Sequence, residues 1–468
     1  MRRLFFFVST ILVLVGCISK EQKEILKEQA RKEAQIDNLL RSLTLEEKLH
    51  LCFGLGPKPI EGDEAVVDSI KRAYPGYAGA TYPLRRVGIP ALLLCDGPAG
   101  LRIDNVQATN EVKDYWCTSF PIGSLLASTW NNDAIEEVGR AIGNETREYG
   151  VDIILGPGQN IHRHPLGGRN YEYFSEDPFL SGMISAAYVR GVQSQGVGTS
   201  IKHFAVNNQE TSRLSNDARV SQRALREIYL RNFEYTLKNS EPWTIMTSYN
   251  FINNVHASEN YDLLTTIVRK EWGYKGLLVT DWGAGYDSAK QIEAGQNLIQ
   301  RGKPWRYEQV VKALEEGTLT EKQIDNSVRY VLELVDKSYR MKVQKGEAPK
   351  HSGTPDLATH NYIARKISAE GMVLLKNSDC LPLNGGQKVA LYGSTSYSLI
   401  AGGLGAGDVN SKYVKTLPQA FESLGFVVNK DIQKVYEAYI TDFKKYMKAN
   451  PQPSQARKIL PGQPVIPE

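Results

Sequence analysis

The feature that most constrains the fold of this chain is an alternation of short apolar runs and longer amphipathic stretches between residues 91 and 300. The apolar runs have the length of buried strands and lie at 91–98, 151–157, 199–204, 243–250 and 276–283. The amphipathic stretches have helical spacing and lie at 132–150, 181–196, 221–239, 260–273 and 288–300. Strands that alternate with helices over such a distance predict a parallel sheet covered by helices.

Such a sheet can stay open and doubly wound, or it can close into an eight-fold barrel. No glycine-rich phosphate loop follows the first predicted strand, which disfavours the dinucleotide-binding form of the open sheet. A region of about 300 residues suits a barrel with long loops. We therefore predict a TIM-like (β/α)8 barrel over 37–345. Thr44 and Glu47 have the spacing of a capping box and predict a helix start near its beginning.

A second α/β region is predicted over 360–468. It contains a helical stretch at 360–377, a strand at 388–395, the glycine-rich segment AGGLGAGDVN (401–410) and a helix at 418–426. This span is short for a closed three-layer sheet, so we expect an incomplete α/β sandwich domain. A lone glycine-rich loop is weak evidence for nucleotide binding.

The N-terminus has the pattern of an export signal. Arg2 and Arg3 precede a mostly apolar run at 4–15, which is too short for an ordinary membrane-spanning helix. The run ends in LVGC (14–17), which resembles the bacterial lipoprotein box and implies a signal peptide over 1–17 with lipidation at Cys17. A polar tether over 18–36 would follow. We expect an exported protein, periplasmic or anchored to the outer membrane by lipid; the alternative is a plain signal sequence.

Composition narrows the classes of partner. The formal net charge is only +4, and basic residues do not interleave with aromatic ones in an extended platform, so nucleic-acid binding is not expected. The other cysteines, Cys52, Cys95, Cys117 and Cys380, form no CxxC or Cys/His spacing. We expect buried free thiols, no metal and no cofactor.

Polar side chains gather where the predicted strands end. They are Asp96, Arg169 and Arg213 on or after strand ends, the pair Lys202 and His203, and Tyr249 and Asp281. The carboxyl ends of parallel barrel strands share one rim, so these groups are expected to meet. Each also has an ordinary structural explanation, such as helix capping by Asp281. Asp287, however, directly precedes the helix predicted at 288 and is better placed as its cap.

The rim carries a dense mixture of hydrogen-bond donors and acceptors. Hydroxyl groups both donate and accept, so a ligand covered in hydroxyls suits this set. Tyr249 and Trp282 add flat apolar faces for a sugar ring. A phosphate would require more cations and a glycine cradle, and a metal would require more closely spaced ligands. A saccharide is the predicted ligand.

Six motifs follow one another along the chain: DGPAGLR (96–102), GRNYEYFSEDP (168–178), KHFAVNNQE (202–210), ETSR (210–213), MTSYN (246–250) and VTDWGA (279–284). In sequence and order they closely resemble glycoside hydrolase family 3, in particular its two-domain bacterial β-glucosidases. The resemblance implies that Asp281 is the catalytic nucleophile, that Trp282 lines the cleft beside the next sugar, and that Met246 packs below it. It also implies a set that holds the sugar in the first subsite: Asp96, Arg102, Arg169, Lys202, His203, Arg213 and Tyr249.

The implied activity is that of a retaining, exo-acting β-glucosidase on oligosaccharides or glycosides. Such enzymes use a carboxylate nucleophile and a second carboxyl group as acid/base. We expect the cations Lys202, Arg169 and Arg213 to keep the pKa of Asp281 low. Alternatives are a β-xylosidase or α-L-arabinopyranosidase on the same scaffold, or a truncated, inactive sugar-binding homologue.

Two departures from the family pattern concern the second domain. In two-domain members the acid/base is a glutamate on a second-domain loop, and the family spacing places it beyond residue 468. Glu370 and Glu422 lie in helical patterns where surface roles are expected, so no acid/base is assigned. Relatives commonly carry a serine facing the sugar in the glycine-rich segment, where this chain has Ala406.

Overall fold

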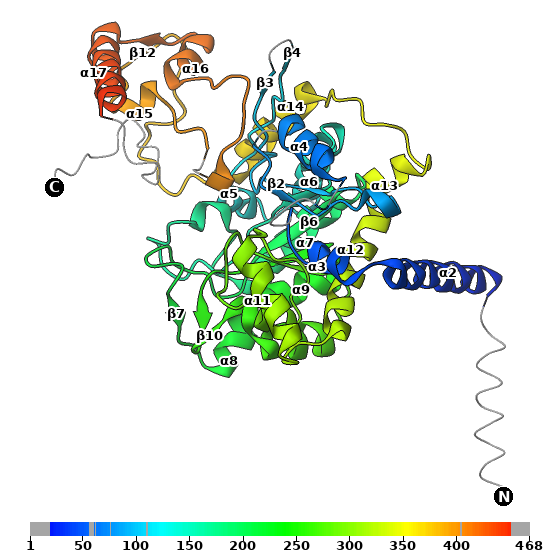
Figure 1. Cartoon of the computed structure of the whole chain (residues 1–468). Coiled ribbons are helices and arrows are strands. Elements are labelled where there is room, and N and C mark those ends of the chain that lie inside the picture. Colours follow the sequence, from blue (N-terminus) through cyan, green and yellow to red (C-terminus); the bar gives the residue numbers. More distant parts are fainter. Residues whose placement is uncertain are drawn as a thin grey trace, which may run out of the picture.

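The computed structural model describes residues 19–450, except 56–59, 61, 75, 109–110 and 403–404 (Figure 1). The predicted signal peptide and Cys17 lie outside the described residues. Among the described helices, none combines the length and the apolar character needed to cross a membrane. Helix α2 (Lys20–Ser42) runs through the predicted tether and continues into the start of the predicted barrel region.

A curled six-stranded sheet forms the centre of the chain, with strand order β1-β2-β5-β6-β8-β11. The pairs from β2 to β11 are parallel, as predicted, whereas β1 is antiparallel to β2. The strands are β1 (Gly79–Ala80), β2 (Leu93–Asp96), β5 (Ile153–Leu155), β6 (Gly198–Phe204), β8 (Thr244–Thr247) and β11 (Leu277–Thr280). Their side chains are buried almost without exception, because helices cover the outer face and side chains fill the inner one.

Two segments outside the six strands continue the hydrogen bonding from β11 back to β1. The Thr280 amide donates to the Leu298 carbonyl oxygen at 3.0 Å, and the Gly54 amide donates to that of Ile299 at 3.0 Å. The Leu55 amide then donates to the Ala80 carbonyl oxygen at 2.9 Å. The structure therefore departs from the predicted regular barrel in two ways. Strand β1 is antiparallel to its neighbour, and the two strand positions between β11 and β1 are occupied by short segments, around Leu298 and Gly54, that lack strand geometry.

The helix predicted over 288–300 is shorter than expected. It ends at Ala294, and Gly295 follows with φ of +106°, a conformation that favours glycine. The residues after it join the sheet instead. Hydrogen bonding of 297–300 to β11 and to the segment around Gly54 outweighs the local helical pattern.

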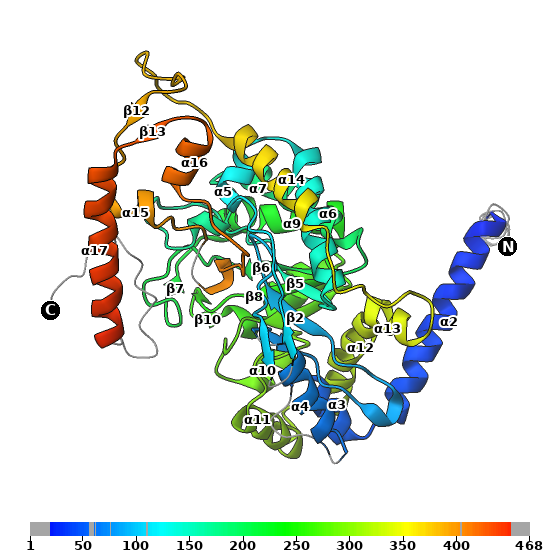
Figure 2. The same cartoon turned by 90° about the horizontal axis from the view of Figure 1, so that it is seen from above.

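Helices pack around the sheet in the order of the chain, with α6, α7 and α9 as successive neighbours (Figure 2). The barrel-region helices are α3 (Leu45–Leu51), α4 (Glu64–Ala73), α5 (Gly123–Ser128), α6 (Asn132–Glu148), α7 (Pro178–Gln193), α8 (Gln222–Ala224), α9 (Arg231–Ser240), α10 (Ser288–Ala294), α11 (Pro304–Glu315), α12 (Glu321–Lys337) and α13 (Tyr339–Gln344). Two π-helices, η3 (Leu225–Tyr229) and η5 (Asp262–Glu271), replace α-helical geometry in stretches predicted as helices. The capping box of Thr44 and Glu47 is present at the start of α3.

Glycines let α6 and α7 approach each other closely. A Cβ atom added at Gly191 would lie 2.3 Å from the backbone oxygen of Glu136. We expect Gly191→Ala to lower the free energy of unfolding by about 2 to 3 kcal/mol, because helix backbones must separate to admit the methyl group. Urea unfolding measures the loss. Gly385→Ala is the control, since a Cβ there meets nothing within 4 Å; equal effects of the two substitutions would contradict the close approach.

In the described part of the barrel region, short strands form two further small sheets outside the central one. They are β3 (Val106–Ala108) paired with β4 (Glu111–Lys113), and β7 (Asp217–Ala218), β9 (Phe251–Ile252) and β10 (Val255–His256) in one small sheet. Cys52, Cys95 and Cys117 are buried free thiols, as predicted, whereas Cys380 is an exposed free thiol.

The C-terminal part forms a smaller lobe, on the opposite side of the barrel region from α2 (Figures 1 and 2). Helix α14 (Leu357–Gly371) packs on the barrel region, and the chain then continues into the smaller lobe. The lobe contains the parallel strands β12 (Lys388–Val389) and β13 (Val427–Val428), with α15 (Ser394–Tyr397), α16 (Leu417–Ser423) and α17 (Lys430–Ala449). In this lobe the described residues therefore show two short strands, three α-helices and the 3-10 helix η6 (Gly405–Gly407) rather than a full α/β sandwich. The apolar side chains at 372–375 are 62–92% exposed.

Candidate active site

A cleft of about 1280 Å3 opens at the carboxyl ends of the parallel strands. Because the strands are parallel, the polar groups that end them converge there. All ten site residues predicted from the sequence line the cleft: Asp96, Arg102, Arg169, Lys202, His203, Arg213, Met246, Tyr249, Asp281 and Trp282. Tyr171, Glu210 and Arg301 join them, together with Gly405, Ala406 and Asp408 from the smaller lobe.

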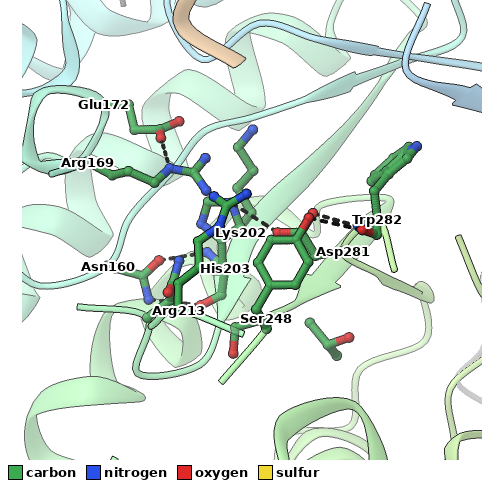
Figure 3. A network of polar contacts seen from close by, with 12 residues as sticks. Asn160, Arg169, Glu172, Lys202, His203, Arg213, Ser248, Asp281 and Trp282 are labelled. Atoms are coloured by element: carbon green, nitrogen blue, oxygen red, sulfur yellow. Dashed lines mark hydrogen bonds and ion pairs between the residues drawn. The ribbon is translucent and has the colours of Figure 1, made fainter. Parts of the chain in front are cut away.

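Asp281 lies at the end of β11 with its carboxylate held from several sides (Figure 3). Its side chain is largely buried, and its Oδ1 accepts a hydrogen bond of 2.7 Å from the Trp282 amide. The Tyr249 hydroxyl donates to the Trp282 carbonyl oxygen at 3.2 Å and interacts with the neighbouring Asp281 carboxylate, whose other oxygen lies 3.6 Å from His203 Nε2. The group is therefore oriented by residues from three neighbouring strand ends.

The capping role considered for Asp281 belongs to Asp287. The Asp287 carboxylate accepts hydrogen bonds from the amides of Ala289 and Lys290, at 3.0 and 3.1 Å, at the start of α10. Of the two aspartates in this strand-to-helix connection, Asp287 is the helix cap, as the sequence predicted. Asp281 points into the cleft and is free of any helix-capping contact.

The expected low pKa of Asp281 is wrong in direction. Burial raises the pKa of this carboxyl above its ordinary value, and it outweighs the opposing effects of Arg169, the Trp282 amide, the Tyr249 hydroxyl and Lys202. The reason is that the strand end lies deep in the barrel, so the carboxylate loses more hydration than the cations return. Arg169 and Lys202 still keep the pKa of Asp281 lower than burial alone would make it.

This raised pKa predicts a stability effect. Below the ordinary aspartate pKa of 3.8, Asp281 is protonated in both folded and unfolded chains and contributes no pH-dependent difference. As pH rises through the higher folded pKa, the wild type loses stability because it must ionise a buried group. We expect the stability advantage of Asp281→Asn over the wild type to grow as the pH rises above 3.8 and through the higher folded pKa. Urea unfolding across this range measures it; a stability advantage that shrinks with pH would contradict the raised pKa.

His203 is held as a neutral ring. Burial lowers the pKa of His203 well below its ordinary value, and the charges of Arg169, Lys202 and Arg213 lower it further. Its Nδ1 lies 3.1 Å from the Tyr173 hydroxyl, which fixes the ring on that side. Asn160 accepts from the His203 amide and donates to its carbonyl oxygen, both at 2.8 Å. A neutral His203 can donate from Nε2 toward Asp281 or a sugar hydroxyl.

Arg169 and Glu172 form a buried ion pair at the cleft wall (Figure 3). Burial alone would lower the pKa of Arg169 and raise that of Glu172, but their mutual attraction, together with other charges nearby, outweighs burial in both cases. The pKa of Arg169 is raised and that of Glu172 is lowered, so both groups stay charged. Glu172 thus orients the guanidinium that faces Asp281.

A second group of charges surrounds Asp96 at the end of β2. The Lys202 ammonium lies 3.9 Å from one Asp96 carboxylate oxygen, and the Arg102 guanidinium lies 3.6 Å from the other. Across the cleft, Arg213 lies over the Tyr249 ring at 4.8 Å and pairs with Glu210 at 3.1 Å. These groups present donors and acceptors at several points, as recognition of a polyhydroxylated ring requires.

Apolar side chains complete the cleft. The Trp282 indole Nε1 donates to the Ala78 carbonyl oxygen at 2.7 Å, which fixes the ring while it lines the cleft. Met246 lies almost fully buried at the cleft surface, in β8. The aromatic wall and the buried thioether give the cleft apolar surface beside its charged groups.

A loop of the smaller lobe closes one side of the cleft. The Arg102 guanidinium donates to the Gly405 carbonyl oxygen at 2.9 Å, and Asn410 bonds to Tyr115, Asn105 and the Cys117 amide. Ala406 lines the cleft at the position where the family pattern has serine, so this chain offers no hydroxyl there. The loop is thus fastened to the barrel region from both of its flanks.

Four carboxylates among the described residues line the cleft: Asp96, Glu210, Asp281 and Asp408. Glu370 and Glu422, both considered from the sequence, do not line it. Glu370 accepts from Asn131 at 2.6 Å, and Glu422 pairs with Lys430, so both have the surface roles expected. Within the described ranges, no group of three or more His, Cys, Asp and Glu side chains could hold a metal ion.

Sequence reasoning missed several residues that support the site. Glu172 and Tyr173 lie within the motif at 168–178, so the motif itself was the signal that could have found them. Glu210 likewise lies where the motifs at 202–210 and 210–213 meet, three residues before its partner Arg213. Asn160 carries no comparable pattern, and its role follows from contact with His203, which only the fold brings close.

The chain was compared with known proteins. The model of the glycosyl hydrolase family 3 N-terminal domain matches residues 80–334. An exo-α-(1→6)-L-arabinopyranosidase from Bifidobacterium longum is 40% identical over 367 residues, covering 76% of this chain and 45% of that protein. A β-glucosidase B from Emericella nidulans is 39% identical over 387 residues, covering 81% and 42%. The chain therefore spans less than half the length of these curated relatives.

A solved structure of a β-glucosidase has a similar fold. The structure of β-glucosidase 3B from Thermotoga neapolitana in complex with α-D-glucose superposes with a TM-score of 0.82 at 41% sequence identity. The superposition covers 92% of this chain and 59% of that one. The likeness thus extends over both the barrel region and part of the smaller lobe.

Proposed function

Since the chain belongs to glycosyl hydrolase family 3, we propose that it acts as a retaining, exo-acting β-glucosidase. It would release terminal β-D-glucosyl residues from the non-reducing ends of oligosaccharides or glycosides. The observation that carries the proposal is the Asp281 carboxylate, oriented at the carboxyl end of β11 inside a cleft of mixed donors and acceptors.

The chemistry proceeds in two displacements. Asp281 attacks the anomeric carbon, the bond from that carbon to the leaving oxygen breaks, and a glucosyl ester forms on Asp281. The leaving oxygen takes a proton from an acid. Water then attacks the same carbon, gives its proton to the conjugate base, and releases Asp281. Two inversions leave the sugar with its original configuration.

The charges around Asp281 suit this role. Arg169 and Lys202 oppose the effect of burial on the pKa of Asp281, so they favour the ionised nucleophile. A neutral His203 adds a hydrogen-bond donor without a further positive charge. Asp96, with Lys202 and Arg102 beside it, is placed to accept hydrogen bonds from sugar hydroxyls away from the reacting carbon. Such contacts orient the ring for attack.

No acid/base is assigned among the cleft carboxylates. Asp96 and Glu210 pair with cations of the cleft wall, Asp281 is the proposed nucleophile, and Asp408 matches no acid/base position of the family pattern. We propose that the acid/base is supplied from outside the described residues, on a second-domain loop as in the family pattern. The domain bounds, export and lipidation at Cys17 stay predictions.

A second candidate is an α-L-arabinopyranosidase, which the relative from Bifidobacterium longum favours. An α-L-arabinopyranoside has the ring configuration of a β-D-galactoside without its hydroxymethyl group. It thus differs from a β-D-glucoside at two positions that first-subsite groups contact.

Dinitrophenyl glycosides distinguish these candidates, because their leaving group needs little acid assistance. We expect kcat/KM for the β-D-glucopyranoside to exceed that for the α-L-arabinopyranoside and the β-D-xylopyranoside at least about tenfold. A preference for the arabinopyranoside would replace the leading candidate. Glucose binding without turnover of any of the three would favour a sugar-binding homologue instead.

A further inference from the structure

Arg306 is among the largest side chains that the described part of the chain buries completely, at 2% exposure. It lies in the first turn of α11 and outside the residues that line the cleft. Its Nη2 donates to three carbonyl oxygens, those of Gly283 at 3.1 Å, Ala284 at 3.0 Å and Gly285 at 2.8 Å. Its Nη1 donates to Gln291 Oε1 at 3.2 Å. Backbone and amide oxygens thus surround this buried charge.

The three carbonyl groups belong to the turn that directly follows Asp281 and Trp282. Gly283 and Gly285 have φ of +91° and +77°, conformations that glycine adopts readily. This turn therefore presents three successive carbonyl oxygens to one guanidinium. A guanidinium stays charged when buried and offers several donors in one plane, so a single side chain can hold all three.

The same turn connects to the carboxylate of Asp281. The Ala284 amide donates to the Asp281 carbonyl oxygen at 3.0 Å, and the Trp282 amide donates to the Asp281 carboxylate at 2.7 Å. On the far side of the turn, the Gly285 amide donates to His256 Nε2 at 3.1 Å. Burial and the charge of Arg306 lower the pKa of His256 to about 4, although a backbone hydrogen bond opposes them, so its ring is a neutral acceptor.

We propose that Arg306 is a positioning residue that fixes the Gly283–Gly285 turn and, through it, the orientation of Trp282 and the Asp281 carboxylate. The catalytic part of this inference rests on the proposed function. Arg306 touches neither the cleft nor the substrate. It acts by holding the backbone whose amide bonds to the nucleophile. Misplacement of a nucleophile by about 1 Å can reduce a rate on the order of 100-fold.

Arg269 provides a matched control at the opposite end of β11. Arg269 is half-buried. Its guanidinium donates to the carbonyl oxygens of Tyr274 at 2.9 Å and Gly276 at 2.6 Å, and to Asn297 Oδ1 at 2.8 Å. Those residues flank the start of β11, whereas Arg306 holds the turn after its end. Loss of either arginine removes a charge bonded to backbone, but only Arg306 bonds to the turn beside Asp281.

The first readout is amide hydrogen exchange in peptides that cover 281–286, which needs no activity. We expect Arg306→Met to speed exchange in these peptides about tenfold relative to the wild type, with Arg306→Lys between them. Arg269→Met should leave the exchange of these peptides unchanged. Unchanged exchange in both Arg306 variants, or equal acceleration by Arg269→Met, would overturn the proposal.

The second readout is covalent labelling by dinitrophenyl 2-deoxy-2-fluoro-β-D-glucoside. Attack by Asp281 expels dinitrophenolate, and the electron-poor sugar ester persists on the enzyme. We expect Arg306→Lys to lower the maximal labelling rate about tenfold while the half-saturating concentration stays within about twofold. Arg269→Lys should label as the wild type does. Failure of the wild type to label would count against the proposed function, whereas equal labelling of wild type and Arg306→Lys would count against Arg306.

Discussion

Replacing Asp281 with alanine removes turnover of dinitrophenyl β-D-glucoside, with an expected loss in kcat on the order of 10⁴-fold or more. The loss is large because, in the proposed mechanism, Asp281 forms the covalent bond to the sugar, and alanine has no group that could form it. Release of dinitrophenolate, followed by absorbance, measures it. Glucose affinity should persist within about tenfold, since Asp96, Lys202 and Arg102 remain in place.

Asp287→Ala is the matched control for this loss. It removes an aspartate from the same strand-to-helix connection, but one whose carboxylate caps α10. We expect a cost of about 1 kcal/mol in the free energy of unfolding, with turnover within about threefold of the wild type. Similar turnover in the Asp281→Ala variant and the wild type would show that another group is the nucleophile.

The rate of the 468-residue chain should depend steeply on the leaving group. If no acid is available in the cleft, a leaving group that needs protonation is released on the order of 10³-fold more slowly than from an enzyme that has one. Dinitrophenolate needs little protonation and escapes most of that loss. We therefore expect measurable turnover of the dinitrophenyl glucoside and very slow cleavage of cellobiose. Product release from both substrates, at equal enzyme concentration, measures the contrast.

Azide distinguishes two causes of slow turnover: the lack of an acid/base and a poorly formed active site. Without a base, water attacks the glucosyl ester slowly, whereas azide needs no deprotonation and can attack directly. We expect azide to accelerate dinitrophenyl glucoside turnover and to yield β-glucosyl azide, because two inversions occur. Rapid cellobiose hydrolysis and no response to azide would place an acid/base within this chain, with Glu210 and Asp408 as the cleft carboxylates to test.

Much of the site could be predicted because polar residues interrupt apolar strands. Asp96, Lys202 and Asp281 end runs that are otherwise buried, and parallel strands bring such ends to one rim. Asp287 could be separated from Asp281 by its position directly before α10. The motifs then identified Arg102 and Met246, which no periodicity pattern would have selected.

The features that escaped prediction depend on contacts between distant segments. β1 has only two residues, too few to show strand periodicity, and its reversed direction follows from pairing with β2. The residues 297–300 follow a helical pattern in the sequence but bond to the sheet in the fold. Arg306 lies in a charged helix start that predicts a surface position, and only packing under the Gly283–Gly285 turn buries it.

The direction of the Asp281 pKa illustrates the same limit. Nearby cations could be inferred from the order of motifs, and they predicted a low pKa. The depth of the carboxylate in the barrel could not be inferred from the sequence, and burial has the larger effect on its pKa. A raised pKa makes Asp281 a cost to stability at neutral pH, so the group that the proposed reaction requires is also one that destabilises the fold.

The most direct test of the account is to identify the residue that forms the covalent intermediate. The full chain is incubated with dinitrophenyl 2-deoxy-2-fluoro-β-D-glucoside, digested, and sequenced by tandem mass spectrometry. The account predicts one fluoroglucosyl group per chain, on Asp281 within the peptide containing VTDWGA (279–284). A fluoroglucosyl group on Asp96, Glu210 or Asp408, or no labelling of a folded chain that binds glucose, would contradict it.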